Sequence, residues 1–415
     1  MSYFFRRPVQ FLLSKFLPQP SPSKILRLSF LTFLSCHITR KLHSFETEWT
    51  FADEKSNFDQ DFIDPKFASS SLMTTLSDES NYKIFTGTAN IDLAQEIATH
   101  LDAALGRIIH YPSPSGEVNL RVLDNVRNQH VFVVQSLGPP VNDNITELFL
   151  IVSALKRSSA KKVTCVIPYI SYMRHNEMNY ARRKMLSIAD IARMLEQVGC
   201  DDVITINLHI PETKGFFNIP VLNLDVTAMG ASYLLRKRLE DCCVVSLDGK
   251  KSYVQRAYDM KTYLDKNGVQ SSFACLIKDE TKSNEDTKVY SHIGSEMNGK
   301  DCILVDNIIE GGETLSSCTD YVRNQGANRI FMFVPHGILT PEALKKIDIV
   351  PVDEVVTTNT IKEHGKYSDK VRYLSVGKML AEAICHVKEN KSLEEVRRNK
   401  LSEEKARMSG KSQIS

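Results

Sequence analysis

The sequence predicts an α/β fold, with parallel sheets flanked by helices, on the strength of two observations. From about residue 82 to residue 387, short runs of β-branched and other apolar residues alternate with stretches of helical periodicity. The short runs are apolar almost throughout, which is typical of strands that are buried on both faces of a parallel sheet. Strands that alternate with helices favour a sheet covered by helices on both sides.

Eight runs are expected to be strands. They are residues 83–87, 130–135, 162–168, 202–208, 242–247, 301–306, 329–335 and 354–359. Amphipathic patterns predict helices at residues 145–158 and 187–199. Gly199 and Gly326 each follow a helical stretch, as the glycines that end helices do.

The order of elements repeats along the chain, which indicates two similar α/β domains. Both QVGCDDVITI and NQGANRIFMF place a glycine and a few polar residues between a helix and a strand. We therefore expect a basic leader with a disordered polar linker at residues 1–80, an N-terminal domain at 81–225, a C-terminal domain at 226–387 and a charged tail at 388–415.

The composition is that of a globular protein, since 42% of the residues are hydrophobic and 25% are charged. This excludes a collagen-like or wholly disordered chain. The formal net charge is +2, but residues 1–45 carry +7 and residues 388–415 carry +3, which leaves −8 for residues 46–387. Binding of nucleic acid needs a basic face, so the acidic body argues against nucleic acid as a partner.

The leader allows two interpretations. Residues 1–45 contain no acid and are dotted with arginine, lysine and serine, a pattern typical of organelle transit peptides. They are either a mitochondrial transit peptide or an untargeted extension of a cytoplasmic protein, with Met73 as an alternative start. The apolar run at residues 25–38 is interrupted by Arg27 and is shorter than the roughly 20 residues that span a bilayer, so no membrane span is expected.

The stretch with most chemical information runs from Cys302 to Thr314. An apolar strand ends in Asp306, and a glycine-containing loop leads to a helix that is expected to begin near Thr314. Ligands of parallel sheets bind beyond the carboxyl ends of the strands. There an aspartate can accept hydrogen bonds from ribose hydroxyls, while loop amides and a helix N-terminus hold a phosphate. The alternative is an ordinary strand–turn–helix connection.

Two further segments are candidates for a site. His209 follows a buried strand, where it is either a ligand-binding or a structural histidine. Residues 172–184 form a polar loop between a strand and a helix, which either binds a ligand or is simply solvated.

Taken in order, these segments resemble the ribose-phosphate pyrophosphokinase family, also called phosphoribosyl pyrophosphate synthetases. The landmarks are KIFTGTAN, VNDNITEL, VIPYISYMR, ITINLH, GFFNIPVLNL, ILVDN, HGIL and TTNTI, and they extend from Tyr82 to about Val387. The resemblance implies two phosphoribosyltransferase-like domains and assembly into hexamers. It also implies Mg²⁺-dependent transfer of the β,γ-pyrophosphoryl group of ATP to the 1-hydroxyl of ribose 5-phosphate, a step of nucleotide biosynthesis.

The resemblance assigns roles to individual residues. It implies that Lys278 is catalytic, that Arg174, Glu117 and His209 bind ATP, and that His209 and Asp248 hold Mg²⁺. The ribose-phosphate-binding residues that it implies are Asp306, Asn307, Gly311, Gly312 and Thr314.

Four ligand-binding loops depart from the family pattern. In the ribose-phosphate loop, Asn307 replaces an acid, Gly311 a threonine and Glu313 a glycine. In the flexible loop, Asp279 and Glu280 follow Lys278 where the family has K-x-R. The remaining departures are Arg174-His175-Asn176 for R-Q-D and Asp248-Gly249-Lys250-Lys251 for D-x-G-G. A carboxylate about 4 Å from a phosphate costs roughly 1 kcal/mol in water and about 4 kcal/mol at an effective dielectric constant of 20, unless it points away or is neutralised.

Three hypotheses follow. The chain is an active or weakened pyrophosphokinase that uses ATP, ribose 5-phosphate and Mg²⁺, or a catalytically impaired regulatory subunit in a mixed hexamer with active paralogues. The third hypothesis is a binding module that senses ribose phosphate or nucleotide. Homo- or hetero-oligomers are expected in the first two cases.

Overall fold

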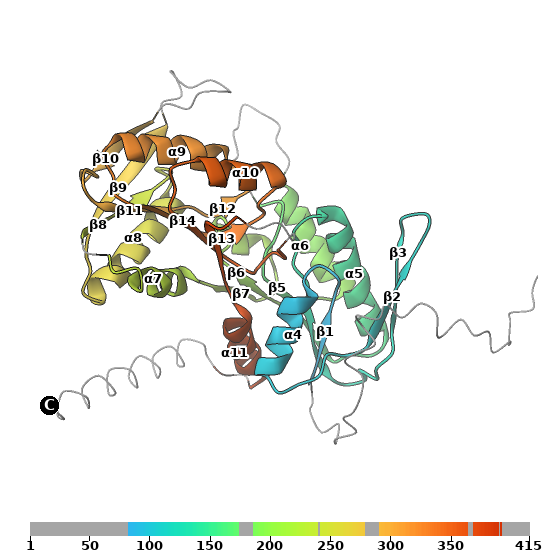
Figure 1. Cartoon of the computed structure of the whole chain (residues 1–415). Coiled ribbons are helices and arrows are strands. Elements are labelled where there is room, and N and C mark those ends of the chain that lie inside the picture. Colours follow the sequence, from blue (N-terminus) through green and yellow to red (C-terminus); the bar gives the residue numbers. More distant parts are fainter. Residues whose placement is uncertain are drawn as a thin grey trace, which may run out of the picture. The chain divides into compact units, whose positions relative to one another are not determined.

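The first sheet of the computed structural model has five parallel strands, and its order follows the chain (Figure 1). Its strands are β1 (Tyr82–Thr86), β4 (His130–Val134), β5 (Lys162–Ile167), β6 (Asp202–Ile206) and β7 (Val221–Leu224). Its helices are α4 (Ile91–His100), α5 (Val141–Arg157) and α6 (Ser187–Val198). The interiors of β4, β5 and β6 are buried, as their largely apolar sequences predict, whereas β7 at the edge is mostly half-buried. The structure describes residues 82–173, 186–239, 241–278, 290–363, 368–389 and 391.

The second sheet is larger and contains one antiparallel edge. Its order is β10-β9-β8-β11-β13-β14-β15, and β12 pairs with β13. The strands are β8 (Asp241–Ser246), β9 (Gln270–Lys278), β10 (Tyr290–Gly294), β11 (Asp301–Val305), β12 (Ile308–Ile309), β13 (Ile330–Gly337), β14 (Glu354–Thr358) and β15 (Val371–Leu374). Only β9 and β10 pair antiparallel in this sheet; the other pairs among its described strands are parallel. The predicted fold class of parallel sheets flanked by helices is confirmed.

The remaining elements connect or cover these sheets. A separate hairpin consists of β2 (Ile108–Pro112) and β3 (Val118–Val122). A short 3₁₀ helix, η2, spans Pro211–Phe216. The other helices are α7 (Thr227–Leu235), α8 (Lys251–Lys266), α9 (Glu313–Asn324), α10 (Pro341–Ile349) and α11 (Gly377–Lys388).

Residues from both sheets share one hydrophobic cluster, which includes Ile84 of β1 and Val305 of β11. The last described helix, α11, packs against the first one, α4. Polar contacts reinforce this pairing: Ser375, just before α11, donates a hydrogen bond to Glu96 of α4, and Asn90 donates to the carbonyl of Asn359 at 2.9 Å. The two sheets therefore lie in one compact unit.

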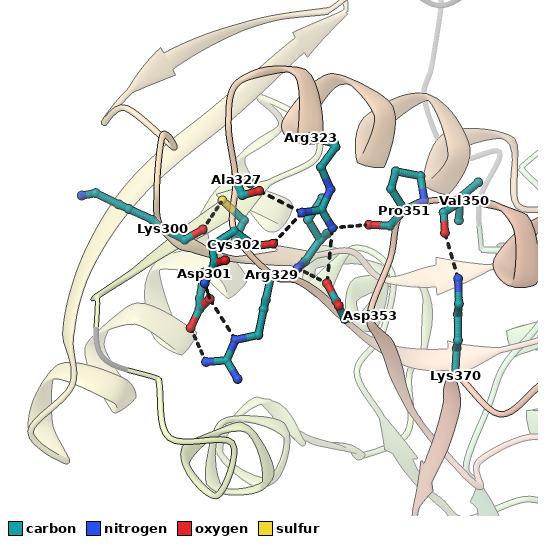
Figure 2. A network of polar contacts seen from close by, with 12 residues as sticks. Lys300, Asp301, Cys302, Arg323, Ala327, Arg329, Val350, Pro351, Asp353 and Lys370 are labelled. Atoms are coloured by element: carbon teal, nitrogen blue, oxygen red, sulfur yellow. Dashed lines mark hydrogen bonds and ion pairs between the residues drawn. The ribbon is translucent and has the colours of Figure 1, made fainter.

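A polar network ties together the amino ends of the central strands of the second sheet (Figure 2). Asp301, at the start of β11, is 6% exposed at its side chain and accepts hydrogen bonds from Arg329, just before β13. Arg323 of α9 donates to the carbonyls of Ala327 and Pro351 and lies 3.5 Å from Asp353, just before β14. These contacts hold the amino ends of the strands together. Ligands of parallel sheets bind at the opposite end, where the strands have their carboxyl ends.

The eight predicted strands are confirmed to within two residues at each end. Helix α6 ends at Gly199, which has a φ of 108° and takes the left-handed conformation that glycine adopts without strain. Helix α9 begins at Glu313, one residue before the expected position. In the described part of the chain, no helix combines the length and the apolar character needed to cross a bilayer. The apolar run at residues 25–38 lies outside the described residues.

Candidate active site

The carboxyl ends of strands from both sheets surround a small cavity. Its polar lining includes Asn207 and His209, which follow β6, together with Asn307, which follows β11, and His336 of β13. Tyr169, after β5, adds an aromatic wall. Parallel strands end at the same edge of their sheet, so this is the position where ligands of such sheets bind.

Asn307 connects the two sheets through His209. Its Nδ2 lies 2.6 Å from Nδ1 of His209, and the residue is only 2% exposed. Its Oδ1 is buried and has no hydrogen-bond partner among the described residues. The structure therefore places Asn307 beside the predicted ATP-binding histidine, in a different cavity from the rest of the ribose-phosphate loop.

The side chain of His336, on β13, connects the second sheet to the first, and sequence reasoning assigned no role to it. Its Nε2 donates to the carbonyl of Asn207 at 3.2 Å, and Nδ1 lies 2.9 Å from the Thr360 hydroxyl. Burial lowers the pKa of His336 to about 4. The ring is therefore neutral near pH 7, with Nε2 as its donor.

The predicted ribose-phosphate loop forms a second hollow, with about 80 Å³ of room for water-sized groups. Asp306, directly after β11, borders it and is 8% exposed. Gly311, Gly312 and Thr314 line the hollow at the N-terminus of α9. Gly312 has a φ of 78°, a conformation that favours glycine, and a Cβ there would lie 3.3 Å from Cα of Ala343, which is a tight contact. Exposed backbone amides at a helix N-terminus suit a phosphate group.

Glu313, which replaces a family glycine in this loop, has a cationic partner. Nζ of Lys346, on α10, lies 2.6 Å from Oε1 of Glu313. The same Nζ donates to the carbonyl of Gly311 at 3.0 Å. The repulsion that the sequence predicted for Glu313 is therefore offset by a neighbouring positive charge, which the sequence pattern did not reveal.

The turn after β8 carries Asp248 and two lysines. One carboxylate oxygen of Asp248 accepts a hydrogen bond from the Lys250 amide at 3.1 Å, and the other lies 3.4 Å from Lys250 Nζ. Asp248 is 38% exposed at its side chain, so it remains accessible to a ligand. Lys251, the first residue of α8, places a further charge at this turn.

The donor set suits a metal ion that arrives with a nucleotide. Among the described residues, no group of three or more His, Cys, Asp or Glu side chains is arranged as a metal cage. Mg²⁺ usually keeps several waters and is held by one or two carboxylates plus substrate phosphates. Asp248 provides such a carboxylate, and His209 lies next to α8 through an edge-to-face contact with Tyr253. Mg²⁺ bound mainly through phosphates fits these residues.

Arg256 of α8 is a buried charged residue that the sequence analysis missed. It is 8% exposed, and no described residue forms a hydrogen bond or ion pair with its guanidinium. Burial lowers its pKa, while the carboxylates of Asp225 and Asp306 oppose that shift. Arg256 is spaced four residues from the buried Met260 and eight from the buried Leu264, which places it on the apolar face of α8. This spacing could have predicted its burial from the sequence.

The hairpin that carries Glu117 is anchored to α5. His110 of β2 has its Nδ1 3.0 Å from a carboxylate oxygen of Glu147. Burial raises the pKa of Glu147, but contacts from His110 and Thr88 outweigh burial and leave the pKa below its usual value. Glu117 itself is exposed and forms no hydrogen bond or ion pair with a described residue.

Several predicted residues fall at or beyond the limits of the described chain. Lys278 is exposed at the end of β9. Arg174, His175 and Asn176 lie outside the described residues, as do Asp279 and Glu280.

Comparisons with known proteins agree with this geometry. Residues 82–199 match the N-terminal domain of ribose phosphate pyrophosphokinase, and residues 265–398 match the phosphoribosyl synthetase-associated domain. The ribose-phosphate pyrophosphokinase of Ralstonia nicotianae is 34% identical over 306 residues, which are 73% of this chain and 94% of the relative. That of Neisseria meningitidis is 33% identical over 312 residues, covering 75% of this chain and 93% of the relative.

A solved structure matches as well. The crystal structure of phosphoribosylpyrophosphate synthetase from Mycobacterium smegmatis superposes with a TM-score of 0.66 at 27% identity. The match covers 75% of this chain and 99% of that one.

Proposed function

Because the chain belongs to the ribose-phosphate pyrophosphokinase family, we propose that it makes phosphoribosyl pyrophosphate from ATP and ribose 5-phosphate. In this reaction the 1-hydroxyl oxygen of the sugar forms a bond to the β-phosphorus of ATP. The bond from that phosphorus to the bridging oxygen of AMP breaks, the hydroxyl loses its proton, and AMP leaves.

The observation that carries the proposal is the hollow between Asp306 and the N-terminus of α9. Asp306 accepts hydrogen bonds from ribose hydroxyls, which places the sugar at the carboxyl end of β11. The amides from Gly311 to Thr314 hold the 5-phosphate. Fixing both ends of the sugar orients its 1-hydroxyl, and positioning is a large part of catalysis in phosphoryl transfer.

We place the nucleotide beside this sugar. Arg174 is proposed to pack on the adenine, Glu117 and His209 to contact ATP, and Lys278 to neutralise charge on the transferring group. Mg²⁺, when bound with ATP, neutralises phosphate charge, and Asp248 with His209 would hold it. The buried contact between Asn307 and His209 links the sugar loop to this nucleotide end.

Lys346 also bears on the choice between an active and an impaired enzyme. The impaired alternative depends on the negative charges that Glu280 and Glu313 add near the phosphates. Lys346 neutralises the second of these, and Glu280 lies outside the described residues. A compensated substitution favours retained phosphate binding, and therefore favours the active enzyme.

Further features remain proposals that follow from the family. We propose that residues 81–225 and 226–387 are phosphoribosyltransferase-like domains and that the chain forms oligomers, either with itself or with paralogues. We also propose a cytoplasmic location, or a mitochondrial one if residues 1–45 act as a transit peptide.

Replacement of Asp306 by Asn tests where the sugar binds. The variant keeps the shape of the side chain but removes its charge. We expect KM for ribose 5-phosphate to rise about tenfold, because a hydrogen bond to a charged group contributes about 1.5–3 kcal/mol. KM for ATP should change little. Steady-state kinetics with each substrate varied in turn provide the measurement. Equal changes in both KM values, or no change in either, contradict the placement of ribose at Asp306.

A further inference from the structure

Helix α10 and the residue that caps it, Thr340, contact the second half of the ribose-phosphate loop. The backbone amide of Thr340 donates to the carbonyl of Glu310 at 3.2 Å. The hydroxyl of Thr340 donates to the same carbonyl and also caps α10 by accepting from the Ala343 amide. Two turns further along α10, Lys346 reaches the end of the loop.

Lys346 makes two contacts of different kinds with this loop. Its Nζ lies 2.6 Å from Oε1 of Glu313 and 3.0 Å from the Gly311 carbonyl that it hydrogen-bonds. The ion pair cancels a charge, and the hydrogen bond fixes a peptide unit of the loop. Because one cation makes both contacts, the charge of Glu313 and the conformation at Gly311 are coupled.

The carboxylate of Glu313 lies close over the loop. A Cβ added to Gly311 would be only 2.6 Å from Oε2 of Glu313, so the side chain folds back against the glycine backbone. Both residues line the hollow, whereas Lys346 does not. Without Lys346, this carboxylate would repel an incoming phosphate, with the repulsion reduced by water because the Glu313 side chain is 61% exposed.

We propose that Lys346 is a positioning residue that enables a loop carrying Glu313 to bind the phosphate group of a sugar phosphate. It acts through Glu313 and Gly311 and does not touch the substrate. Glu313 and Lys346 thus work as a unit, in which the lysine removes the repulsion that the glutamate introduces. The inference depends on the proposed function for the identity of the ligand, ribose 5-phosphate.

The test compares Lys346→Met, Glu313→Gln and the double variant with the unmodified chain. Lys345→Met is the matched control. Lys345 is the exposed neighbour of Lys346 on α10, and its replacement removes the same charge. The dissociation constant of ribose 5-phosphate is measured by calorimetry, which does not require turnover. KM for each substrate and the melting temperature are measured alongside it.

We expect Lys346→Met to weaken ribose 5-phosphate binding about fivefold, since it removes the cation beside the Glu313 carboxylate, which is 61% exposed and therefore partly screened by water. KM for ATP and the melting temperature stay close to their original values. The double variant returns to within about twofold of the original affinity, because the repulsive carboxylate is gone. Glu313→Gln alone binds at least as tightly as the unmodified chain, and Lys345→Met is unchanged.

Two results overturn the proposal. If the double variant binds as weakly as Lys346→Met, the lysine does not act by offsetting the charge of Glu313. If Lys346→Met leaves affinity unchanged, or weakens both substrates along with stability, the contact is merely structural. Failure of the proposed function is distinguishable: binding of ribose 5-phosphate without turnover contradicts the reaction but leaves the role of Lys346 intact.

Discussion

Glu313 and Asn307 show that a substituted site residue has to be judged together with its partners. From the sequence, Glu313 predicts repulsion of phosphate, yet Lys346 lies 2.6 Å away and offsets its charge. The two residues are 33 positions apart in the chain, and Lys346 looks like any solvated lysine on a helix. The sequence alone therefore does not reveal that they pair. Asn307 was expected at the ribose-phosphate loop, but its side chain contacts His209 of the other half.

The buried ring of His336 makes stability depend on pH. Its pKa is about 4 in the folded chain and about 6.5 when unfolded, so only the unfolded state takes up a proton between these values. The stabilisation is complete above pH 6.5 and is lost as the pH falls toward 4. From pH 7 to pH 5, this histidine should remove about 2 kcal/mol from the free energy of unfolding.

Urea unfolding of a His336→Gln variant measures this dependence, because glutamine keeps a donor for the Asn207 carbonyl but does not titrate. The variant is expected to lose less stability than the unmodified chain over the same pH range. His100→Gln is the control, since the His100 side chain is 40% exposed. Parallel pH curves for His336→Gln and the unmodified chain would show that another group causes the loss.

At the scale of elements, the sequence predicts the central strands well and the edges poorly. The runs that became β4, β5 and β11 are largely apolar, because both of their faces are buried. The missed strands β7, β12 and β15 have four residues or fewer. The hairpin of β2 and β3 and the antiparallel pair β9–β10 were also missed. Short or partly exposed strands are defined by their neighbours in space, which a local pattern does not contain.

The network at the amino ends of β11 and β13 should matter for stability (Figure 2). Arg329→Met leaves the buried carboxylate of Asp301 without its cation, so we expect a loss of about 2–3 kcal/mol in the free energy of unfolding. Arg107→Met is the control, because Arg107 pairs with Asp124 while its own side chain is 68% exposed, and it should cost less than about 1 kcal/mol. Equal losses in urea unfolding of the two variants would contradict the special role of Asp301.

At the scale of the whole molecule, the two sheets form one unit whose carboxyl strand ends supply the candidate site. His209 comes from the first half, whereas Asp306 and the loop at α9 come from the second. The sequence predicted these strand-end positions, because parallel strands place their final residues at one edge. It did not predict Arg256 or His336, whose importance comes from burial between elements that are distant in the chain.

The charge distribution takes on a different meaning at this scale. The net negative charge of residues 46–387 indicates only that nucleic acid is not a partner. The acids in the ribose-phosphate loop, taken by themselves, predict weaker binding of phosphate. Lys346 supplies a positive charge to this loop, while Lys250 and Lys251 lie at the turn that carries Asp248. Local pairing therefore decides whether phosphate can bind, and net charge does not.

The most direct test of the central claim is turnover by the purified full-length chain alone, supplied with ATP, ribose 5-phosphate and Mg²⁺. We predict that phosphoribosyl pyrophosphate and AMP form in equal amounts, and that neither forms when ribose 5-phosphate is omitted. If the folded protein makes no phosphoribosyl pyrophosphate alone, but alters the rate of an active family member when the two are mixed, the claim is contradicted and the chain is a regulatory subunit.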